Sequence, residues 1–157
     1  MRYSYITALD TLTKWAIKEG YKNISLDHYD VSYIDWEKKS LNEPKVIKIE
    51  GSYDYEHQTY LMLHELGHHV IRKDWDKFKQ KLPAAATAEE KDTKKKENKH
   101  KRRTSYIVSA LHEEFSAWDE GIKLAKKLNI KVNLNKWNRF KTKCLMGYIR
   151  YYGSGQH

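Results

Sequence analysis

The sequence predicts an α+β fold in which a small sheet packs on a layer of helices. A chain of 157 residues has the length of one domain, and a hydrophobic content of 39% is sufficient for a single modest core. Strand-like alternation falls between residues 23 and 51, and helical periodicity precedes and follows it. We therefore expect residues 1–157 to form a single domain.

The first third of the chain predicts one helix followed by three strands. Apolar residues at helical spacing predict a helix over Thr7 to Glu19, and Gly20 is a typical stop signal. Alternating side chains then predict strands over Asn23 to Tyr29 and Val31 to Trp36. The clearest strand pattern covers Lys45 to Gly51.

The remainder of the chain predicts helices, interrupted by one low-complexity stretch. Helical periodicity indicates helices over Asp54 to Arg72, Asp76 to Lys81, Ser105 to Leu128 and Leu134 to Tyr152. The third of these carries a stripe of apolar and small residues at three- and four-residue spacing, namely Ile107, Ala110, Leu111, Ala117, Trp118, Gly121, Ile122 and Ala125.

The stretch Pro83 to Arg103 changes character abruptly. Alanines lead into mixed charges, and Lys94 to Arg103 is almost entirely basic and has no apolar face. We expect a basic, mobile insertion at about residues 84–103, either a solvated loop or a fraying helix extension. The alternative is a basic arm that binds nucleic acid or an acidic partner, which the net charge of +9 and the pI near 9.4 favour. No recognisable nucleic-acid-binding motif accompanies it.

The most informative motif is His64-Glu65-Leu66-Gly67-His68. Positions four apart lie on one face of a helix, so His64 and His68 can offer two imidazole nitrogens to one zinc ion. Glu65 can act as a general base on a water molecule. Leucine and valine residues around the motif repeat at helical spacing, which supports a helix here.

A catalytic zinc requires a third protein ligand and one open position. Glu114 lies in the middle of the apolar stripe of the Ser105 to Leu128 helix, where a carboxylate is costly to bury unless it is paired or bound to a metal. Its neighbour Glu113 is turned about 100° away, toward the more polar side of the helix. We therefore prefer Glu114 to Glu113 as the third ligand. The alternative is that Glu114 only pairs with a basic residue.

These residues resemble the gluzincin-type metallopeptidases, most nearly the small ImmA/IrrE-like and phage-borne HExxH proteins. The resemblance runs from roughly Val46 to Ala125 and rests on the HELGHH run and on the Glu-Glu-x-x-Ala helix. It implies a zincin-like fold with HExxH on the active-site helix. It implies that His64, His68 and Glu114 bind Zn²⁺ and that Glu65 is the catalytic base.

The sequence departs from the pattern of this family at one position, and the resemblance also implies which strand binds peptide. Ala117 occupies the small-residue place three positions after the liganding glutamate, but some relatives have an aspartate at the next position, where this chain has Trp118 and then Asp119. The group that orients His64 is therefore left open. In zincin-like folds the strand before the metal helix often forms the edge that binds extended peptide, so Lys45 to Gly51 is the candidate edge strand.

Other histidines and the aromatic residues give weaker signals. His57 shares the stripe of His64 but lies roughly 10 Å along the helix axis, too far to be a ligand. His69 is turned about 100° from its neighbour and is expected at the surface or behind the ligands, and His112 lies off the Glu114 stripe. Three tyrosines near the C-terminus are expected to pack, with donation of a hydrogen bond to an oxyanion as the alternative. They are Tyr148, Tyr151 and Tyr152.

The single cysteine and the absence of an apolar run indicate the compartment. Cys144 cannot form an internal disulfide or a cysteine-ligated zinc site, and its apolar helical surroundings favour core packing in a reducing compartment. Lys14 interrupts what would have to be a signal-peptide core, and no apolar run approaches the length of a membrane span. We expect a cytoplasmic protein of a bacterium or a phage-infected host cell, not bound to a membrane.

The sequence therefore predicts a zinc-dependent peptidase that hydrolyses a protein or peptide substrate through an activated water. Two alternatives stay open. One is a metal-stabilised regulatory or binding module of a phage or mobile element, which does not cleave peptides. The other is a nucleic-acid-associated protein that acts through Lys94 to Arg103.

Overall fold

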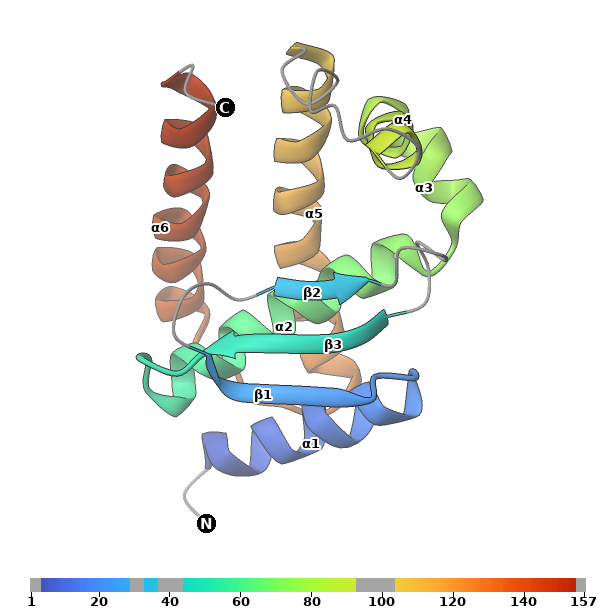
Figure 1. The fold of residues 1–157 in the computed structure, drawn as a ribbon. Helices are drawn as coiled ribbons and strands as arrows, with labels where there is room; N and C mark the ends of the chain where they lie inside the picture. The colour runs from blue at the N-terminus through green and yellow to red at the C-terminus, as the bar shows by residue number, and fades with distance from the viewer. Residues whose placement is uncertain (1–3, 29–32, 37–43, 93–103, 155–157) are drawn as a thin grey trace.

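The computed structural model of this protein describes residues 4–28, 33–36, 44–92 and 104–154 (Figure 1). Its elements are, in chain order, α1 (Tyr5–Lys18), β1 (Asn23–His28), β2 (Tyr33–Trp36), β3 (Pro44–Glu50), α2 (Tyr55–Arg72), α3 (Trp75–Lys81), α4 (Pro83–Asp92), α5 (Thr104–Lys127) and α6 (Leu134–Gly153). Helices predominate and one small sheet accompanies them, so the α+β prediction is confirmed.

Local side-chain caps fix where several helices begin. The carboxylate of Asp54 accepts a hydrogen bond from the backbone N–H of His57 at 2.9 Å and so starts α2. Asp74 and Asn133 cap α3 and α6 in the same way. Gly20 follows α1 with a φ of 98°, a conformation that glycine adopts without strain. The predicted ends of these helices are therefore correct to within a few residues.

The sheet has the strand order β1-β3-β2. β3 pairs in parallel with β1, where Ile24 is opposite Ile47, and antiparallel with β2, where Ile34 is opposite the same residue. The prediction that Lys45 to Gly51 forms an edge is wrong, because β3 is the central strand of the described sheet. Ile47 and Ile49 on one face of this strand are completely buried, and pairing on both edges leaves no open edge on the strand that carries them.

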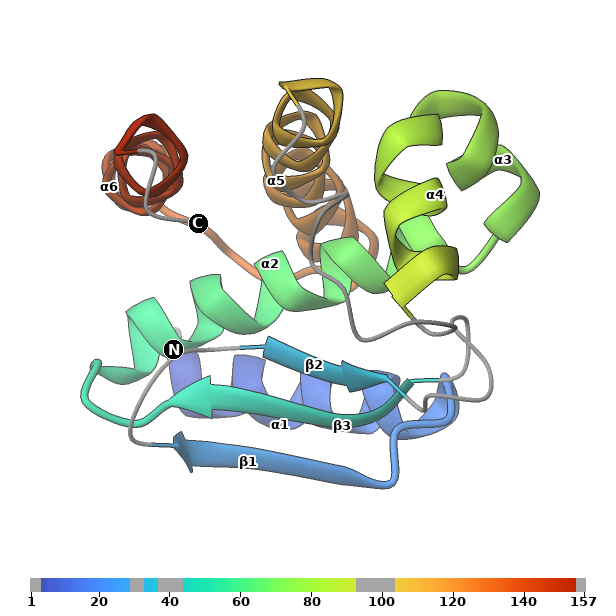
Figure 2. The ribbon, with the colours of Figure 1, turned by 45° about the horizontal axis from the view of Figure 1, so that its top comes forward.

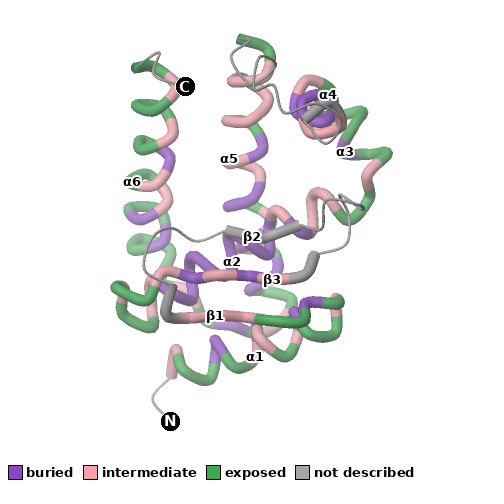
Figure 3. Tube along the Cα trace, viewed as in Figure 1, coloured by how far each residue is buried: buried purple, intermediate pink, exposed green. Residues whose placement is uncertain are grey.

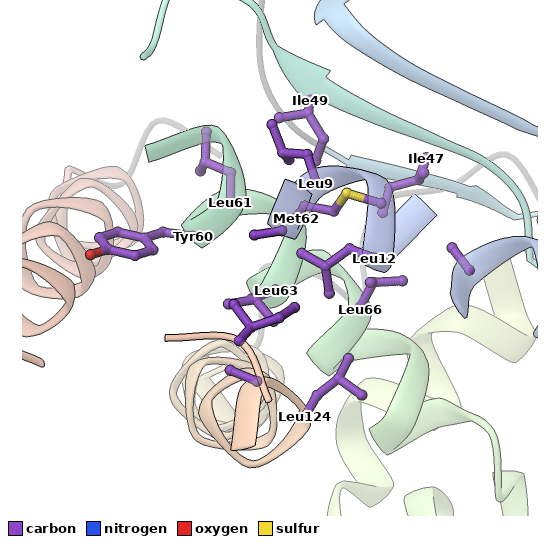
Figure 4. Close-up of a cluster of buried hydrophobic side chains, with 14 of the residues drawn as sticks. Leu9, Leu12, Ile47, Ile49, Tyr60, Leu61, Met62, Leu63, Leu66 and Leu124 are labelled. Carbon is purple, nitrogen blue, oxygen red and sulfur yellow. The ribbon is translucent and has the colours of Figure 1, made fainter. Parts of the chain in front are cut away.

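The main core surrounds α2, with α1 and the sheet on one side and α5 and α6 on the other. Figure 4 shows the side chains that meet there, which include Leu9 and Leu12 from α1, Ile47 and Ile49 from β3, and Leu61, Met62, Leu63 and Leu66 from α2. The buried residues of α1 follow one face, but α2 is buried almost all round in its middle (Figure 3). Polar side chains on α2 are therefore enclosed, and each needs a partner.

A second, smaller core lies where α3 and α4 meet the end of α2. Ala85 and Ala86 of α4 pack there with Phe78 and Leu82. The expectation of a mobile insertion, either a solvated loop or a fraying helix extension, is therefore wrong for residues 84–92, which form most of the packed helix α4. Alanine favours helix strongly and packs closely, but it adds little to an amphipathic pattern, so the helical signal was weak. The basic run Lys94 to Arg103 lies outside the described residues.

Helices α5 and α6 lie on the opposite side of α2 from the sheet, as Figures 1 and 2 show from two directions. α5 contacts both α2 and α6, and α2 also contacts β3, so α2 connects the two halves of the molecule. In the described part of the chain, no helix combines the length and the apolar character that crossing a membrane requires.

Candidate metal centre

The two helices that carry the predicted ligands, α2 and α5, cross in close contact. A Cβ added at Gly67 of α2 would overlap the backbone carbonyl of Ala117 on α5, and one added at Gly121 would lie 2.6 Å from the carbonyl oxygen of Leu63. Each helix therefore needs a glycine at the crossing. Because this contact fixes α5 against α2, Glu114, one turn before Ala117, lies opposite the two histidines of the HExxH motif.

Three side chains predicted as ligands come together at this crossing. Nε2 of His64 lies 3.2 Å from Oε2 of Glu114, and Nε2 of His68 lies 3.5 Å from the same oxygen. The three ligand atoms lie within 4.8 Å of one another. His64 is 4% exposed, and the other two are partly buried. The cluster thus joins residues that are far apart in the sequence, at a site with little access to solvent.

The two distances to Oε2 of Glu114 are compatible with a zinc site. Zinc bonds of about 2.0–2.1 Å at the tetrahedral angle separate neighbouring ligand atoms by roughly 3.4 Å. The 3.2 and 3.5 Å separations around Glu114 Oε2 lie on either side of that value. This oxygen is buried, and among the described residues its polar neighbours at these distances are the two imidazole nitrogens. A buried carboxylate oxygen in that position is well suited to bind a cation.

Glu113, the alternative ligand, has a different place. It was expected on the more polar side of α5, but it is 4% exposed. Arg72 of α2 donates to both of its carboxylate oxygens, with Nε 2.6 Å from Oε1 and Nη2 3.1 Å from Oε2. Oε1 also lies 3.0 Å from Nδ1 of His68. Glu113 therefore holds the far side of the His68 ring and is not in the three-residue cluster.

The carboxylates around the histidines set their charge. Burial would lower the pKa of His68, but Glu114 and Glu113 outweigh it and raise the pKa well above its ordinary value. Burial lowers the pKa of His64, against the opposing effect of Glu114. Burial would raise the pKa of Glu113, but the hydrogen bond from His68 and the charge of Arg72 hold it at about 2. Burial and the two carboxylates therefore shift the pKa values of His64 and His68 in opposite directions.

Glu65, the predicted base, lies beside His64 on α2. It is 6% exposed, and it lines the same pocket as His64. Burial raises the pKa of Glu65 to about 7, although the positive charge of His68 opposes the rise. A carboxyl group that titrates near neutrality at the wall of a pocket can both take up and return a proton.

Trp118 lies four residues after Glu114, at the position where some members of the resembling family have an aspartate. Its ring is stacked on the His64 imidazole, with 4.5 Å between centroids. Asp119, the next residue, instead pairs with Lys141 of α6 at 2.7 Å. Nδ1 of His64 has no hydrogen-bond partner among the described residues. The open question of what orients His64 thus has a structural answer, which is aromatic packing.

A pocket of about 530 Å³ lies beside the cluster. Its lining comes from the end of β3, from α2 and α5, and from one face of α6, and it comprises Glu50, Tyr53, Leu61, His64, Glu65, Trp118, Cys144, Gly147, Tyr148 and Tyr151. Its volume lies in the usual range for small-ligand sites, about 300–1,000 Å³. The pocket places His64 and Glu65 where a bound molecule would contact them.

Three further histidines that the structure describes, His57, His69 and His112, lie away from the cluster. Nδ1 of His57 lies 2.7 Å from Asp54, and His112 is exposed. The expectation of a surface position for His69 is wrong, because it is 3% exposed and its Nε2 lies 3.1 Å from Glu19 of α1. His69 therefore connects α1 to α2, a role that its neighbour in the motif does not share.

The α6 residues singled out in the sequence divide into two groups. Tyr148 and Tyr151 line the pocket, and Tyr152 does not. Cys144 packs against the core, as expected, and also reaches the pocket lining. Burial raises the pKa of the Cys144 thiol to about 11, so it is not a ready nucleophile.

Arg72 is the residue of this region that sequence reasoning missed. It follows His68 by four residues, as His68 follows His64, so all three share one face of α2. That spacing was the available signal. It predicts a basic side chain near any carboxylate that approaches the histidines, and here that carboxylate is Glu113.

Comparisons with known proteins add no relative. No protein-family model matches this chain, and neither the curated proteins nor the solved structures give a match to it. The function proposed below therefore depends on the residues and geometry of the chain itself.

Proposed function

We propose that this protein is a zinc-dependent peptidase. The observation that carries the proposal is the convergence of ligand atoms from His64, His68 and Glu114 beside a pocket that His64 and Glu65 line. Zinc bound by these residues would act as a Lewis acid toward a carbonyl group and would lower the pKa of water. Three protein ligands leave a fourth position open, which is typical of catalytic sites.

The residues of the chain divide the remaining work between them. Glu65, which lines the pocket beside His64, would take the proton of the attacking water and pass it to the leaving amine. Glu113, held by the forked contact from Arg72, keeps the His68 ring in place. Trp118 does the same for the His64 ring by stacking.

We propose that the fold is zincin-like and that the peptide binds along β2. Two features support this: the sheet packs on the helix that carries HExxH, and the next long helix supplies the glutamate. In the described sheet β2 is an edge strand, and Figures 1 and 2 both draw it on the side of α5 and α6. An extended peptide can add to such an edge through backbone hydrogen bonds.

Two further proposals rest on sequence alone. A single cysteine fits a reducing compartment, which supports the cytoplasm of a bacterium or phage-infected cell. The charge of Lys94 to Arg103 supports contact with nucleic acid or an acidic partner, with affinity that falls steeply as salt rises.

The test of the proposed function is cleavage of a peptide library by zinc-loaded wild type and by Glu65→Gln. Glutamine keeps the size of the side chain but removes the base, so we expect the variant to keep its zinc and to lose about 100-fold or more in rate. Asp10→Asn, which changes an exposed carboxylate on α1, is the control and should cleave like wild type. Equal cleavage by wild type and Glu65→Gln contradicts the peptidase mechanism. Zinc binding without cleavage of any peptide favours the metal-stabilised regulatory module.

A further inference from the structure

One wall of the pocket is a single face of α6. Three further lining residues follow Cys144 by three, four and seven positions, namely Gly147, Tyr148 and Tyr151. All four therefore lie along the same side of the helix. The other walls carry the apolar side chains of Tyr53, Leu61 and Trp118. Much of the lining is thus aromatic or aliphatic, although the pocket lies beside a cluster of charged groups.

Gly147 has no explanation in the packing of α6. A glycine inside a helix destabilises it by about 1 kcal/mol relative to alanine. Gly67 and Gly121 are required by the crossing of α2 and α5, but a Cβ added at Gly147 would meet no atom within 4 Å. Gly147 is exposed and lines the pocket, so a larger side chain there would border the pocket and not the interior of the fold.

We propose that Gly147 sets the size of the side chain that the pocket accepts, and that this side chain is large and apolar, as in phenylalanine, tyrosine, leucine or methionine. The proposal rests on the proposed peptidase function, because the pocket opens beside His64 and Glu65, where the reacting peptide bond would be held. The aromatic walls can contact a ring by its face or its edge. A pocket of about 530 Å³ has room for such a ring.

The negative charge in the pocket disfavours acidic side chains. The carboxylates of Glu50 and Glu65 are part of the lining, and Glu114 lies against His64 at its edge. An acidic side chain would enter a region of like charge. The pocket should therefore discriminate strongly against aspartate and glutamate, whatever apolar residue it prefers.

The experiment measures binding without cleavage. The probe is N-acetyl-4-fluorophenylalanine amide, followed by ¹⁹F NMR with a chelator present, and the proteins are wild type, Gly147→Leu and Gly153→Leu. Gly153 is the matched control, since it lies on the same helix, an added Cβ there would also meet no atom within 4 Å, and it is outside the pocket lining. We expect Gly147→Leu to weaken binding about tenfold or more and Gly153→Leu to leave it unchanged.

Any of three results overturns the proposal. They are equal binding of the probe to wild type and Gly147→Leu, no binding of the probe to wild type, and tighter binding of N-acetyl-lysine amide or N-acetyl-glutamate amide than of the probe. Gly147→Ala fills less space and favours the helix, so a smaller weakening in this variant supports the proposal even if Gly147→Leu does not fold. Probe binding needs neither zinc nor turnover. Retained binding with no peptide cleavage therefore contradicts only the proposed function.

Discussion

The indole of Trp118 is stacked on the imidazole of His64, with 4.5 Å between ring centroids and 22° between ring planes. Trp118 is completely buried and also meets Trp137 edge to face at 4.9 Å. A ring so enclosed can move little, so it fixes the plane of His64 by packing. His68 is held differently, by the Glu113 carboxylate at its Nδ1. The two histidines of one motif thus have two kinds of support.

Removal of the stack should weaken zinc binding. In Trp118→Leu the His64 ring gains freedom to rotate, so we expect zinc affinity to fall about 10- to 100-fold, as for other groups that orient ligands. Trp118→Phe retains an aromatic ring and should restore most of the affinity. Competition with a chromophoric chelator measures both variants. Wild-type affinity in Trp118→Leu would show that packing does not orient His64.

Glu113→Gln should affect stability more than Glu114→Gln does. Arg72 is mostly buried and pairs with both oxygens of Glu113, so loss of that charge leaves a buried guanidinium without its main partner. Breaking a buried pair in this way costs about 3–5 kcal/mol. Glu114→Gln leaves Arg72 paired and should lower the free energy of unfolding much less. Urea denaturation in the presence of a chelator separates the two, and equal losses would contradict the assigned roles.

Gly67→Ala should separate α2 from α5. Its Cβ would overlap the carbonyl of Ala117, so the helices must move apart and Glu114 must move with α5. Overpacking of this kind destabilises by about 1–3 kcal/mol, and we expect a weaker zinc site as well. Gly147→Ala is the control for stability, because its Cβ meets nothing and alanine favours the helix. Thermal unfolding should show a lower midpoint for Gly67→Ala alone.

His69 should contribute to loss of stability in acid. Burial lowers the pKa of His69 despite the neighbouring Glu19, and its Nδ1 has no partner among the described residues, so a second proton there would lack an acceptor. Below about pH 6.5, the ordinary pKa of histidine, the unfolded chain therefore binds more protons at this site than the folded chain does. The stability contributed by neutral His69 is complete above that pH and is lost as the pH falls through it.

His69→Gln removes this titration but retains a donor for Glu19. We expect its free energy of unfolding to fall less than that of wild type between pH 7.5 and pH 5.5, by at most about 1.4 kcal/mol per pH unit. Urea denaturation of chelated protein at the two pH values measures the difference. Parallel losses in the two proteins would show that His69 does not titrate in this range.

Sequence patterns predicted the elements well where local chemistry controls them. The start of α2 follows from the Asp54 cap, and the spacing of His64 and His68 follows from the helix itself. The stripe on α5 also favoured Glu114 over Glu113, and Glu114 is the residue that approaches both histidines. These features depend only on the period of a helix and on its termini.

Features that depend on packing between distant elements were not predictable in the same way. The α4 helix has alanines in place of a strong apolar stripe, and β3 carries no sign of which strands flank it. Glu113 was interpreted as polar surface because its partner Arg72 belongs to another helix. From the sequence alone, the two charges of a buried ion pair are interpreted as solvated, because the pair forms only after α2 and α5 have packed.

We expect His64, His68 and Glu114 to bind one zinc ion. The zinc content of wild type and of single variants, after equilibrium dialysis against buffered zinc, tests this directly. We predict one zinc per chain in wild type and in Glu113→Gln at saturating zinc, and none in His64→Ala, His68→Ala or Glu114→Ala. Circular dichroism confirms that each variant is folded. A folded wild type that binds no zinc, or a Glu114→Ala variant that keeps one zinc per chain, would contradict the account.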